Sequence, residues 1–299
     1  MAAARATAFA RTLGLPVKVE IGVSPFGSSR AVVLDLARRA ADAGLDGLIL
    51  GDGFVSTPSF PIWSGGIDCF VELAWLAGKV EMASYGVDAI VLPARDPRIL
   101  AKQACSLSAV TQGRCHLALS AGFWDEDARL FGYDFAERGA RFDEGIRALQ
   151  AGFRGESFDG QFWSWQAPLP ISPCHAVDAP ELWLSGDTPT MRRAVRHGLA
   201  WQPTRLFPAE LAQLAREYFD AGGVGLKIRA RMSTTEPRRG PGALAFPTLV
   251  GPRDYLAEQL EAYIALGASY ISVVCGYDDD SCAATIDALG VAARSLSTV

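Results

Sequence analysis

The sequence predicts an α/β fold, a single closed barrel of eight strand–helix units. Short runs of β-branched and other apolar residues alternate with amphipathic helical patterns along the chain, which is typical of a parallel sheet. No internal linker interrupts the 299 residues, and one such barrel needs about 250. An open, doubly wound sheet is the alternative architecture.

The eight strands are expected where apolar runs are bounded by turn residues. In chain order they are residues 17–23, 47–50, 85–92, 114–120, 182–185, 199–202, 226–232 and 270–275.

Helices are expected between these strands, where apolar residues recur every three or four positions. The first carries Val33, Leu36, Ala37 and Ala40 on one face, and the fourth carries Phe142, Ile146, Leu149 and Phe153. The others are expected at 71–79, 96–110, 190–197, 208–221, 253–266 and 282–295.

The third and fourth units have the most specific local signals. Asp96 is placed to cap the third helix, and Pro97 stands at its first position, where the missing N–H is not needed. Gly113 closes that helix. The fourth strand ends at Gly122, followed by the aromatic pair Phe123-Trp124.

Three connections, 51–68, 155–180 and 233–250, exceed the usual length for α/β units. The second contains a hairpin pattern with Asp159-Gly160 at its turn. The first and third leave the carboxyl face of the barrel, where active sites of this fold are built, so they are candidate substrate lids. The predicted substrate pocket is formed by Phe26, Phe54, Trp63 and Trp124.

Composition excludes several classes of function. A net charge of -5 and a pI near 5.3 give no support for binding to nucleic acid or to an anionic membrane. No apolar run approaches the roughly 18 residues that span a bilayer. Residues 1–16 lack the apolar core of a signal peptide and are interpreted as an N-terminal extension to one domain, 17–299. The expected location is the cytoplasm.

The six cysteines form no CxxC pair and no spacing typical of metal ligands. We therefore expect six thiols and no metal site. A small-molecule substrate is the expected partner, and a homodimer is left open.

Residues 185–190, Ser-Gly-Asp-Thr-Pro-Thr, are the best candidate for a phosphate site. Gly186 permits close approach of a ligand to the backbone, and the following helix start offers free N–H groups to an anion. On local sequence alone, Asp187 is equally a plain helix cap.

The stretch 93–132 resembles the luciferase-like monooxygenase superfamily. The resemblance rests on a basic residue between two prolines (Pro93 to Pro97), a turn altered to Thr-Gln-Gly-Arg at 111–114, and a glycine, aromatic and acidic run from Gly122. It implies a (β/α)8 TIM barrel with long active-site loops that uses a flavin or its 5-deaza analogue, coenzyme F(420).

The same resemblance implies the cofactor contacts. The backbone of Ser185, Gly186, Asp187 and Thr188, with the hydroxyl of Thr190, corresponds to the loop that holds the cofactor phosphate.

A non-prolyl cis peptide that supports the cofactor ring in the family corresponds to Asp88–Ala89, and Gly122 and Phe123 correspond to further cofactor contacts. Asp52 and Asp88 are the candidate catalytic groups, as the main titratable residues near the ring.

The chain departs from the family pattern in ways that favour a deazaflavin. Gly53 stands where many members have a catalytic histidine, and Ala121 stands where luciferase has an arginine for the flavin phosphate. Phe123 replaces a glutamate donor of some deazaflavin enzymes. Hydride transfer needs little acid–base assistance, whereas activation of oxygen by FMN is more demanding.

The predicted function is therefore hydride transfer between coenzyme F(420) and a small organic substrate. An FMN-dependent monooxygenase is the first alternative, and a non-catalytic flavin-binding barrel is an alternative of another class. A phosphate-ligand isomerase or lyase would need a lysine or a carboxylate pair at strand ends. The chain has four lysines: Lys18, Lys79, Lys102 and Lys227.

Overall fold

The computed structural model describes residues 17–22, 28–54, 66–166, 171–236, 247–276 and 278–296. Phe26, Trp63 and the expected N-terminal extension, residues 1–16, lie outside these ranges, so the structure does not test those predictions.

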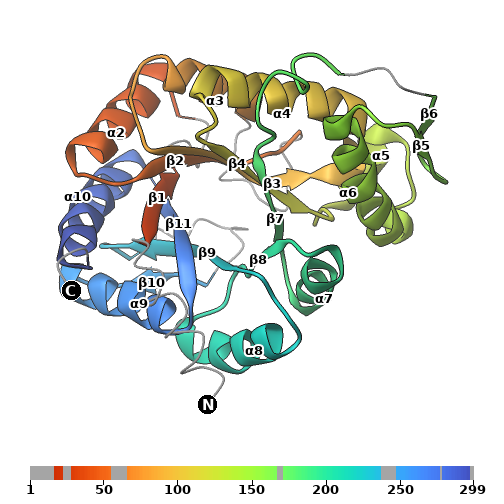
Figure 1. The fold of residues 1–299 in the computed structure, drawn as a ribbon. Helices are drawn as coiled ribbons and strands as arrows, with labels where there is room; N and C mark the ends of the chain where they lie inside the picture. Colours follow the sequence, from red (N-terminus) through yellow and green to blue (C-terminus); the bar gives the residue numbers. More distant parts are fainter. Residues whose placement is uncertain are drawn as a thin grey trace.

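Eight parallel strands close into a barrel, with the helices arranged around its outside (Figure 1). The strands pair in the order β9-β11-β1-β2-β3-β4-β7-β8, and a β8–β9 pairing joins the two ends. This closure confirms the predicted barrel over the open sheet. The strands are β1 (Lys18–Gly22), β2 (Gly47–Leu50), β3 (Ser84–Val91), β4 (Cys115–Ser120), β7 (Glu181–Ser185), β8 (Ala200–Gln202), β9 (Leu226–Ser233) and β11 (Ala268–Cys275).

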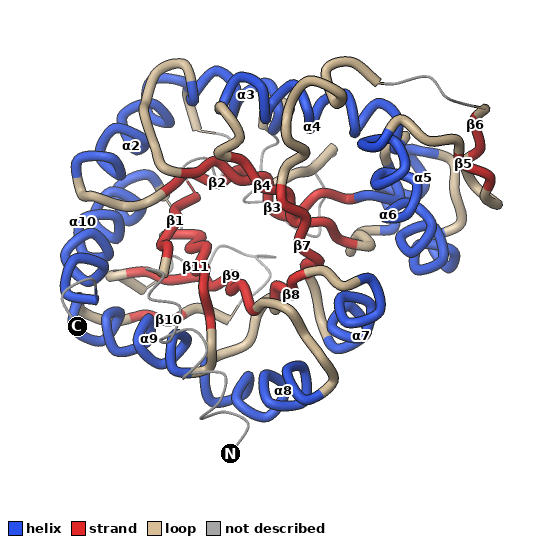
Figure 2. Tube along the Cα trace, in the orientation of Figure 1, coloured by secondary structure: helices blue, strands red, loops and turns tan. Residues whose placement is uncertain are grey.

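The helices lie close to their predicted positions because their apolar faces pack on the barrel (Figure 2). Asp96 accepts a hydrogen bond from the Arg98 backbone, which confirms it as the cap of α4, and Pro97 is the first helical residue. The helices are α2 (Arg30–Asp42), α3 (Cys69–Ala77), α4 (Pro97–Thr111), α6 (Arg138–Arg154), α7 (Thr188–His197), α8 (Pro208–Asp220), α9 (Arg253–Ala265) and α10 (Asp279–Leu296).

The connection after β4 contains a helix that the sequence pattern did not predict, α5 (Asp125–Phe131). Its first turn is wholly acidic, with Asp125, Glu126 and Asp127, and negative charge there is favoured by the helix dipole. Two short 3₁₀ turns precede helices: η1 (Leu92–Ala94) comes before α4, and η2 (Phe135–Glu137) comes before α6.

The predicted hairpin is present outside the barrel. It consists of β5 (Phe158–Asp159) and β6 (Ser164–Trp165), which pair antiparallel, so the turn is a four-residue loop that begins at Gly160. The buried Glu144 carboxylate of α6 accepts hydrogen bonds from three backbone N–H groups of this loop, those of residues 161, 162 and 163. A further two-residue strand, β10 (Leu249–Val250), pairs with the end of β9.

The amino-terminal half of the barrel is filled by polar and aromatic side chains. The His116 ring stacks on Trp183 with ring centroids 3.9 Å apart, and its Nε2 lies 3.2 Å from the buried Glu20 carboxylate. Tyr270 packs edge-on against both rings, and the Lys227 ammonium lies 4.9 Å from the Trp183 centroid. These side chains therefore form one packed layer in the interior of the barrel.

The expectation that all six cysteines are thiols is wrong for two of them. Cys105 of α4 and Cys174, in the segment before β7, form a disulfide with Cα atoms 5.2 Å apart. The two residues are 69 positions apart, so sequence spacing alone does not pair them. Cys69, Cys115, Cys275 and Cys282 are buried thiols.

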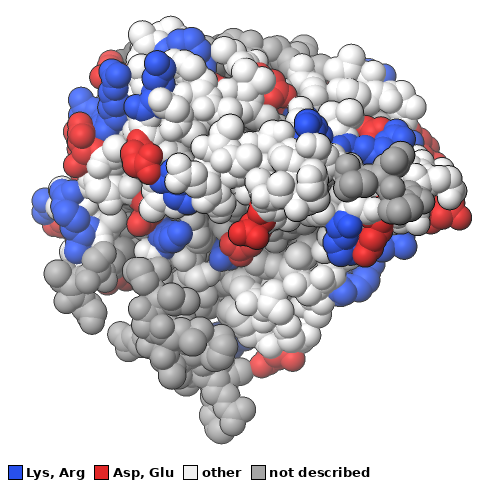
Figure 3. Space-filling view, turned by 45° about the horizontal axis from the view of Figure 1, so that its top comes forward, with Lys and Arg blue, Asp and Glu red and all other residues white. Residues whose placement is uncertain are grey.

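Charged residues of both signs are interspersed on the face drawn in Figure 3, with uncharged surface between them. In the described part of the chain, every helix is too short or too polar to cross a membrane. Nor do His, Cys, Asp and Glu side chains in those ranges gather in threes to hold a metal ion.

Candidate functional site at the carboxyl face of the barrel

Strand β3 carries an irregularity at Asp88–Ala89. The peptide bond between these residues is cis, as the family resemblance predicted. Asp88 pairs with Ala118 of β4 and Ile90 pairs with Leu119, so Ala89 is left out of the ladder as a bulge. Ala89 is the one residue of β3 that is not fully buried. The bulge therefore presents a small, smooth patch of backbone to the barrel mouth.

The Asp88 carboxyl lies at the centre of the barrel and is 1% exposed. Its Oδ2 accepts a hydrogen bond of 2.9 Å from Gln202 Nε2, and its Oδ1 lies 3.6 Å from Arg229 Nη1. Burial raises the pKa of Asp88, while the charge of Arg229 and the Gln202 hydrogen bond oppose the rise. Oδ1 accepts no hydrogen bond from the described residues and faces only the Arg229 guanidinium there, so the hydrogen-bonding capacity of this buried acid is not fully used.

The loop between β7 and α7 has the features of an anion site. Ser185 is 3% exposed, and its Oγ has no hydrogen-bond partner within the described ranges. Gly186 has a φ of +151°, and a Cβ there would lie 2.6 Å from Thr190 Oγ1. Asp187 holds the N-cap position of α7, and its side chain accepts no capping hydrogen bond from the described residues. The first N–H groups of a helix have no partner within the helix, and in α7 they are those of Thr188 and Thr190, because Pro189 has none.

Asp52, the second candidate catalytic residue, lies in a network of donors. Its Oδ1 accepts a 2.6 Å hydrogen bond from Arg95 Nη2, and its Oδ2 accepts from the Val91 backbone at 3.1 Å. Burial acts to lower the pKa of Arg95, but the hydrogen bonds and charge of Asp52 outweigh it and the pKa is raised. Asp52 therefore fastens the loop after β2 to the end of β3, and its catalytic role stays a prediction.

Two groups of aromatic residues flank the mouth. Phe54 packs on Phe131 of α5 with centroids 4.5 Å apart, and the Arg95 guanidinium lies 4.6 Å from its ring. Phe123, which is 51% exposed, packs against Trp124 at 4.7 Å. The predicted pocket residues Phe54 and Trp124 therefore lie in two separate aromatic pairs, Phe54 with Phe131 and Trp124 with Phe123.

Gly122, the glycine that ends the fourth strand unit, has a φ of +85°, a conformation that side chains rarely adopt. A Cβ at this position would lie 3.0 Å from Val91 Cγ1. The chain therefore turns sharply between β4 and the aromatic pair, which places Phe123 at the carboxyl face.

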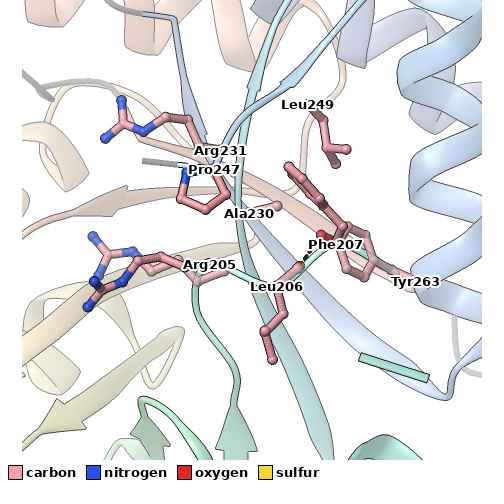
Figure 4. A pocket seen from close by; sticks show the side chains of 9 residues that line it. Arg205, Leu206, Phe207, Ala230, Arg231, Pro247, Leu249 and Tyr263 are labelled. Carbon is pink, nitrogen blue, oxygen red and sulfur yellow. Dashed lines mark hydrogen bonds between the residues drawn. The ribbon is translucent and has the colours of Figure 1, made fainter. Parts of the chain in front are cut away.

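Three arginines that sequence reasoning missed also lie at this face. Arg205 follows β8 with a φ of +64°, and its guanidinium lies 4.5 Å from the Phe123 ring. Arg229 and Arg231 stand two positions apart on β9, and all three line one pocket. In Figure 4 the guanidinium groups of Arg205 and Arg231 point in one direction, away from Leu249 and Tyr263. The sequence signal that could have indicated two of them is the spacing of Arg229 and Arg231 on one predicted strand, because residues two apart share a strand face.

The chain belongs to the luciferase-like monooxygenase family, whose model matches residues 17–234. This membership agrees with the barrel, the bulge in β3 and the β7–α7 loop.

Solved structures with the same fold include enzymes that use either cofactor. An F(420)-dependent secondary alcohol dehydrogenase, in complex with an F(420)–acetone adduct, has a TM-score of 0.76 at 13% identity, covering 93% of this chain and 98% of its own. The oxygenating constituent of 3,6-diketocamphane monooxygenase from Pseudomonas putida, in complex with FMN, has a TM-score of 0.74 at 16% identity, covering 94% and 98%. At such identities the likeness shows the fold.

Curated relatives match shorter segments. The protein Rv0940c of Mycobacterium tuberculosis is 30% identical over 160 residues, 47% of this chain and 56% of its own length. The oxygenase component of a flavin-dependent trigonelline monooxygenase from Acinetobacter baylyi is 26% identical over 145 residues, 46% of this chain and 39% of its own. The matched segments thus span about half, or less, of these relatives.

Proposed function

We propose that this protein is an oxidoreductase that transfers hydride between coenzyme F(420) and a small organic substrate. The observation that carries the proposal is the pairing of the β3 bulge with the buried Asp88 carboxyl, at the carboxyl face of a luciferase-like barrel.

The described residues fit a cofactor with a planar ring and a phosphate. The bulge at Ala89 offers a backbone surface free of bulky side chains, on which a ring can rest. The unpartnered Ser185 Oγ and the first turn of α7 offer donors to a phosphate. A side chain at Gly186 would meet Thr190 and fill this loop.

A bound flavin or deazaflavin supplies the two-electron chemistry, and the protein binds, orients and shields it. Asp88 lies next to the bulge, and burial raises the pKa of its carboxyl. Gln202 and Arg229 fix the orientation of this carboxyl beside the place proposed for the ring.

Coenzyme F(420) is preferred to FMN because of the two departures from the luciferase pattern, Gly53 and Ala121. They remove a histidine and a phosphate-binding arginine on the FMN side, and hydride delivery from a deazaflavin needs neither. The FMN-dependent monooxygenase remains the second candidate, supported by the neighbours that use FMN.

Titration of the purified protein with F(420), FMN and FAD tests the proposal. We expect F(420) to bind at least roughly tenfold more tightly than FMN, a difference of about 1.4 kcal/mol. Stoichiometric FMN that copurifies, with no F(420) binding by fluorescence, would reverse the order of the two candidates. Tight cofactor binding with no reduction or reoxidation by any small carbonyl or imine tested would favour the non-catalytic barrel.

A further inference from the structure

A buried histidine–carboxylate pair lies on the amino-terminal side of Asp88, in the interior of the barrel. His116 of β4 is 3% exposed, Glu20 of β1 is fully buried, and His116 Nε2 lies 3.2 Å from Glu20 Oε2. Neither of these two atoms has a hydrogen-bond partner within the described ranges, so the attraction between the side chains depends on their charges. A buried carboxylate is costly unless a charged or hydrogen-bonding group compensates it.

Two glycines leave room for this pair on the interior faces of β2 and β3. A Cβ on Gly86 would overlap His116 Nε2, and a Cβ on Gly47 would lie 2.5 Å from Glu20 Oε1. The imidazole therefore occupies the space that a side chain at position 86 of β3 would fill.

This placement makes the imidazole a neighbour of Asp88, because side chains two apart on a strand share one face. Gly86 pairs with His116, and Asp88 pairs with Ala118. The imidazole and the Asp88 carboxyl thus occupy successive positions along the same two strands, and two residues of a strand span about 7 Å. At the level of Asp88, β4 contributes only the methyl group of Ala118.

The two charges of the pair act on Asp88 in opposite directions. Burial raises the pKa of Asp88, and Arg229 and Gln202 oppose the rise. The charge of His116 lowers this pKa further, whereas the charge of Glu20 raises it. The other titratable groups around the pair are Lys18, Asp46, Glu181, Lys227 and Tyr270.

We propose that His116 and Glu20 act as a positioning pair that sets the charge of Asp88 beside the cofactor ring. An imidazolium next to the carboxyl stabilises its ionised form, and Glu20 limits this effect by balancing the imidazolium. The charge near a flavin or deazaflavin ring is one means by which a protein tunes its electronics. The effect on Asp88 belongs to the protein alone, whereas its use on a bound cofactor rests on the proposed function.

Infrared difference spectra of the cofactor-free protein test the effect on Asp88. The C=O band of the protonated carboxyl is identified as the band that Asp88→Asn removes, and it is followed from about pH 4 to 9. His116→Gln removes the positive charge and leaves Glu20, so the titration of Asp88 should move to higher pH. Loosened packing would instead admit water and move it to lower pH, so the sign separates an electrostatic role from a structural one.

A second variant and a matched control complete the comparison. Adding Glu20→Gln to His116→Gln should return the titration of Asp88 toward that of the wild type, because both charges are then absent. His197→Gln is the control, since His197 also faces a carboxylate, that of Asp143 at 3.4 Å, but at the end of α7. It should change nothing.

Three results overturn the proposal. They are an Asp88 titration that is unchanged in folded His116→Gln, one that moves to lower pH, and a double variant that keeps the full shift of the single one. Circular dichroism shows whether each variant is folded.

If His116→Gln does not fold, the reciprocal measurement decides. Coupling between two sites is mutual, so in Asp88→Asn the His116 ring should release its proton at a lower pH than in the wild type. Nitrogen-15 NMR follows this ring, and the chain has only three histidines to distinguish. Identical His116 titration curves in the two proteins would overturn the proposal.

Binding of FMN and F(420) is measured separately. If Asp88 responds as expected and neither cofactor binds, the proposed function fails and the action of the pair on Asp88 stands. If a cofactor binds and Asp88 does not respond, the proposed function stands without this pair.

Discussion

Asp88 is the residue whose environment is most unusual in this barrel. Within the described residues, this fully buried acid has one hydrogen-bond donor, one guanidinium beyond hydrogen-bond distance and one oxygen that accepts no hydrogen bond. Because burial raises the pKa of Asp88, the carboxyl is neutral at low pH and acquires charge at a higher pH than an exposed aspartate.

Asp88→Asn should therefore alter a bound cofactor in a pH-dependent way. At low pH both side chains are neutral, and the two proteins should have equal midpoint potentials. As pH rises, the wild-type carboxylate becomes charged and disfavours added negative charge on the cofactor. The midpoint potential of the cofactor in Asp88→Asn should then be more positive than in the wild type, by on the order of 30 mV. Redox titration between pH 5 and 9 measures the difference. A difference that stays constant with pH would show that Asp88 does not titrate beside the cofactor.

Asp127 of α5 gives a second residue-scale prediction. Burial, then the charges of Asp52 and Glu126, raise its pKa from 3.8 to about 6. Between these values the folded protein binds more protons than the unfolded chain, so this group's contribution to stability is present below pH 4 and lost as pH rises through 6. Relative to Asp127→Asn, the wild type should lose about 1–2 kcal/mol between pH 4 and 7, after allowance for solvent screening.

Urea unfolding at several pH values measures this difference. Asp134→Asn, which changes an exposed capping aspartate, provides the comparison on a nearby acid. A gap between wild type and Asp127→Asn that is flat with pH would contradict the raised pKa.

At the scale of elements, we propose that the β7–α7 loop binds the cofactor phosphate. The Ser185 hydroxyl is buried without a described partner, which is unfavourable in the free protein. Ser185→Ala should therefore leave the free energy of unfolding unchanged or slightly higher.

The same variant should weaken FMN and F(420) binding by about 1.5–3 kcal/mol, since one hydrogen bond to a charged phosphate is lost. Riboflavin, which has no phosphate, should bind equally to both proteins. His197→Gln, at the far end of α7 beside Asp143, is the control and should have little effect. Equal losses for riboflavin and FMN would place the phosphate elsewhere.

Local sequence predicted the elements well and the site only in part. Strand β2 has the predicted bounds, and most other elements agree within about two residues at each end, because apolar periodicity reports burial directly. The cis bond at Asp88–Ala89 was predicted from a family resemblance. Arg205, Arg229 and Arg231 were not predicted, since their convergence depends on the β8–β9 pairing that closes the barrel. The pairing of Cys105 with Cys174 likewise depends on tertiary structure.

At the scale of the whole molecule, the packed amino-terminal half of the barrel supports the site above it. Gly86 of β3 faces His116 so closely that a Cβ would overlap the imidazole ring, and His116 is stacked on Trp183. The absence of a side chain at this one position allows the aromatic layer to form.

Gly86→Ala should destabilise the whole barrel by about 1–3 kcal/mol, because the displaced imidazole is held by neighbours that cannot move independently. Gly66→Ala is the matched control, since a Cβ there meets nothing within 4 Å. Thermal unfolding followed by circular dichroism measures both. A melting temperature for Gly86→Ala equal to that of the control would mean that the layer adapts more freely than its packing indicates.

Arg95 contacts both described ends of the connection after β2. Asp52 before the loop and Asp68 after it both face this guanidinium, at 2.6 and 3.8 Å. Ion pairs at the ends of a connection oppose the entropy lost on closing it, which grows by only about 0.6 kcal/mol for each doubling of loop length. The two described ends of this connection are therefore joined through one guanidinium, so a substitution of Arg95 acts on both ends at once while the eight strands of the barrel keep their own pairing.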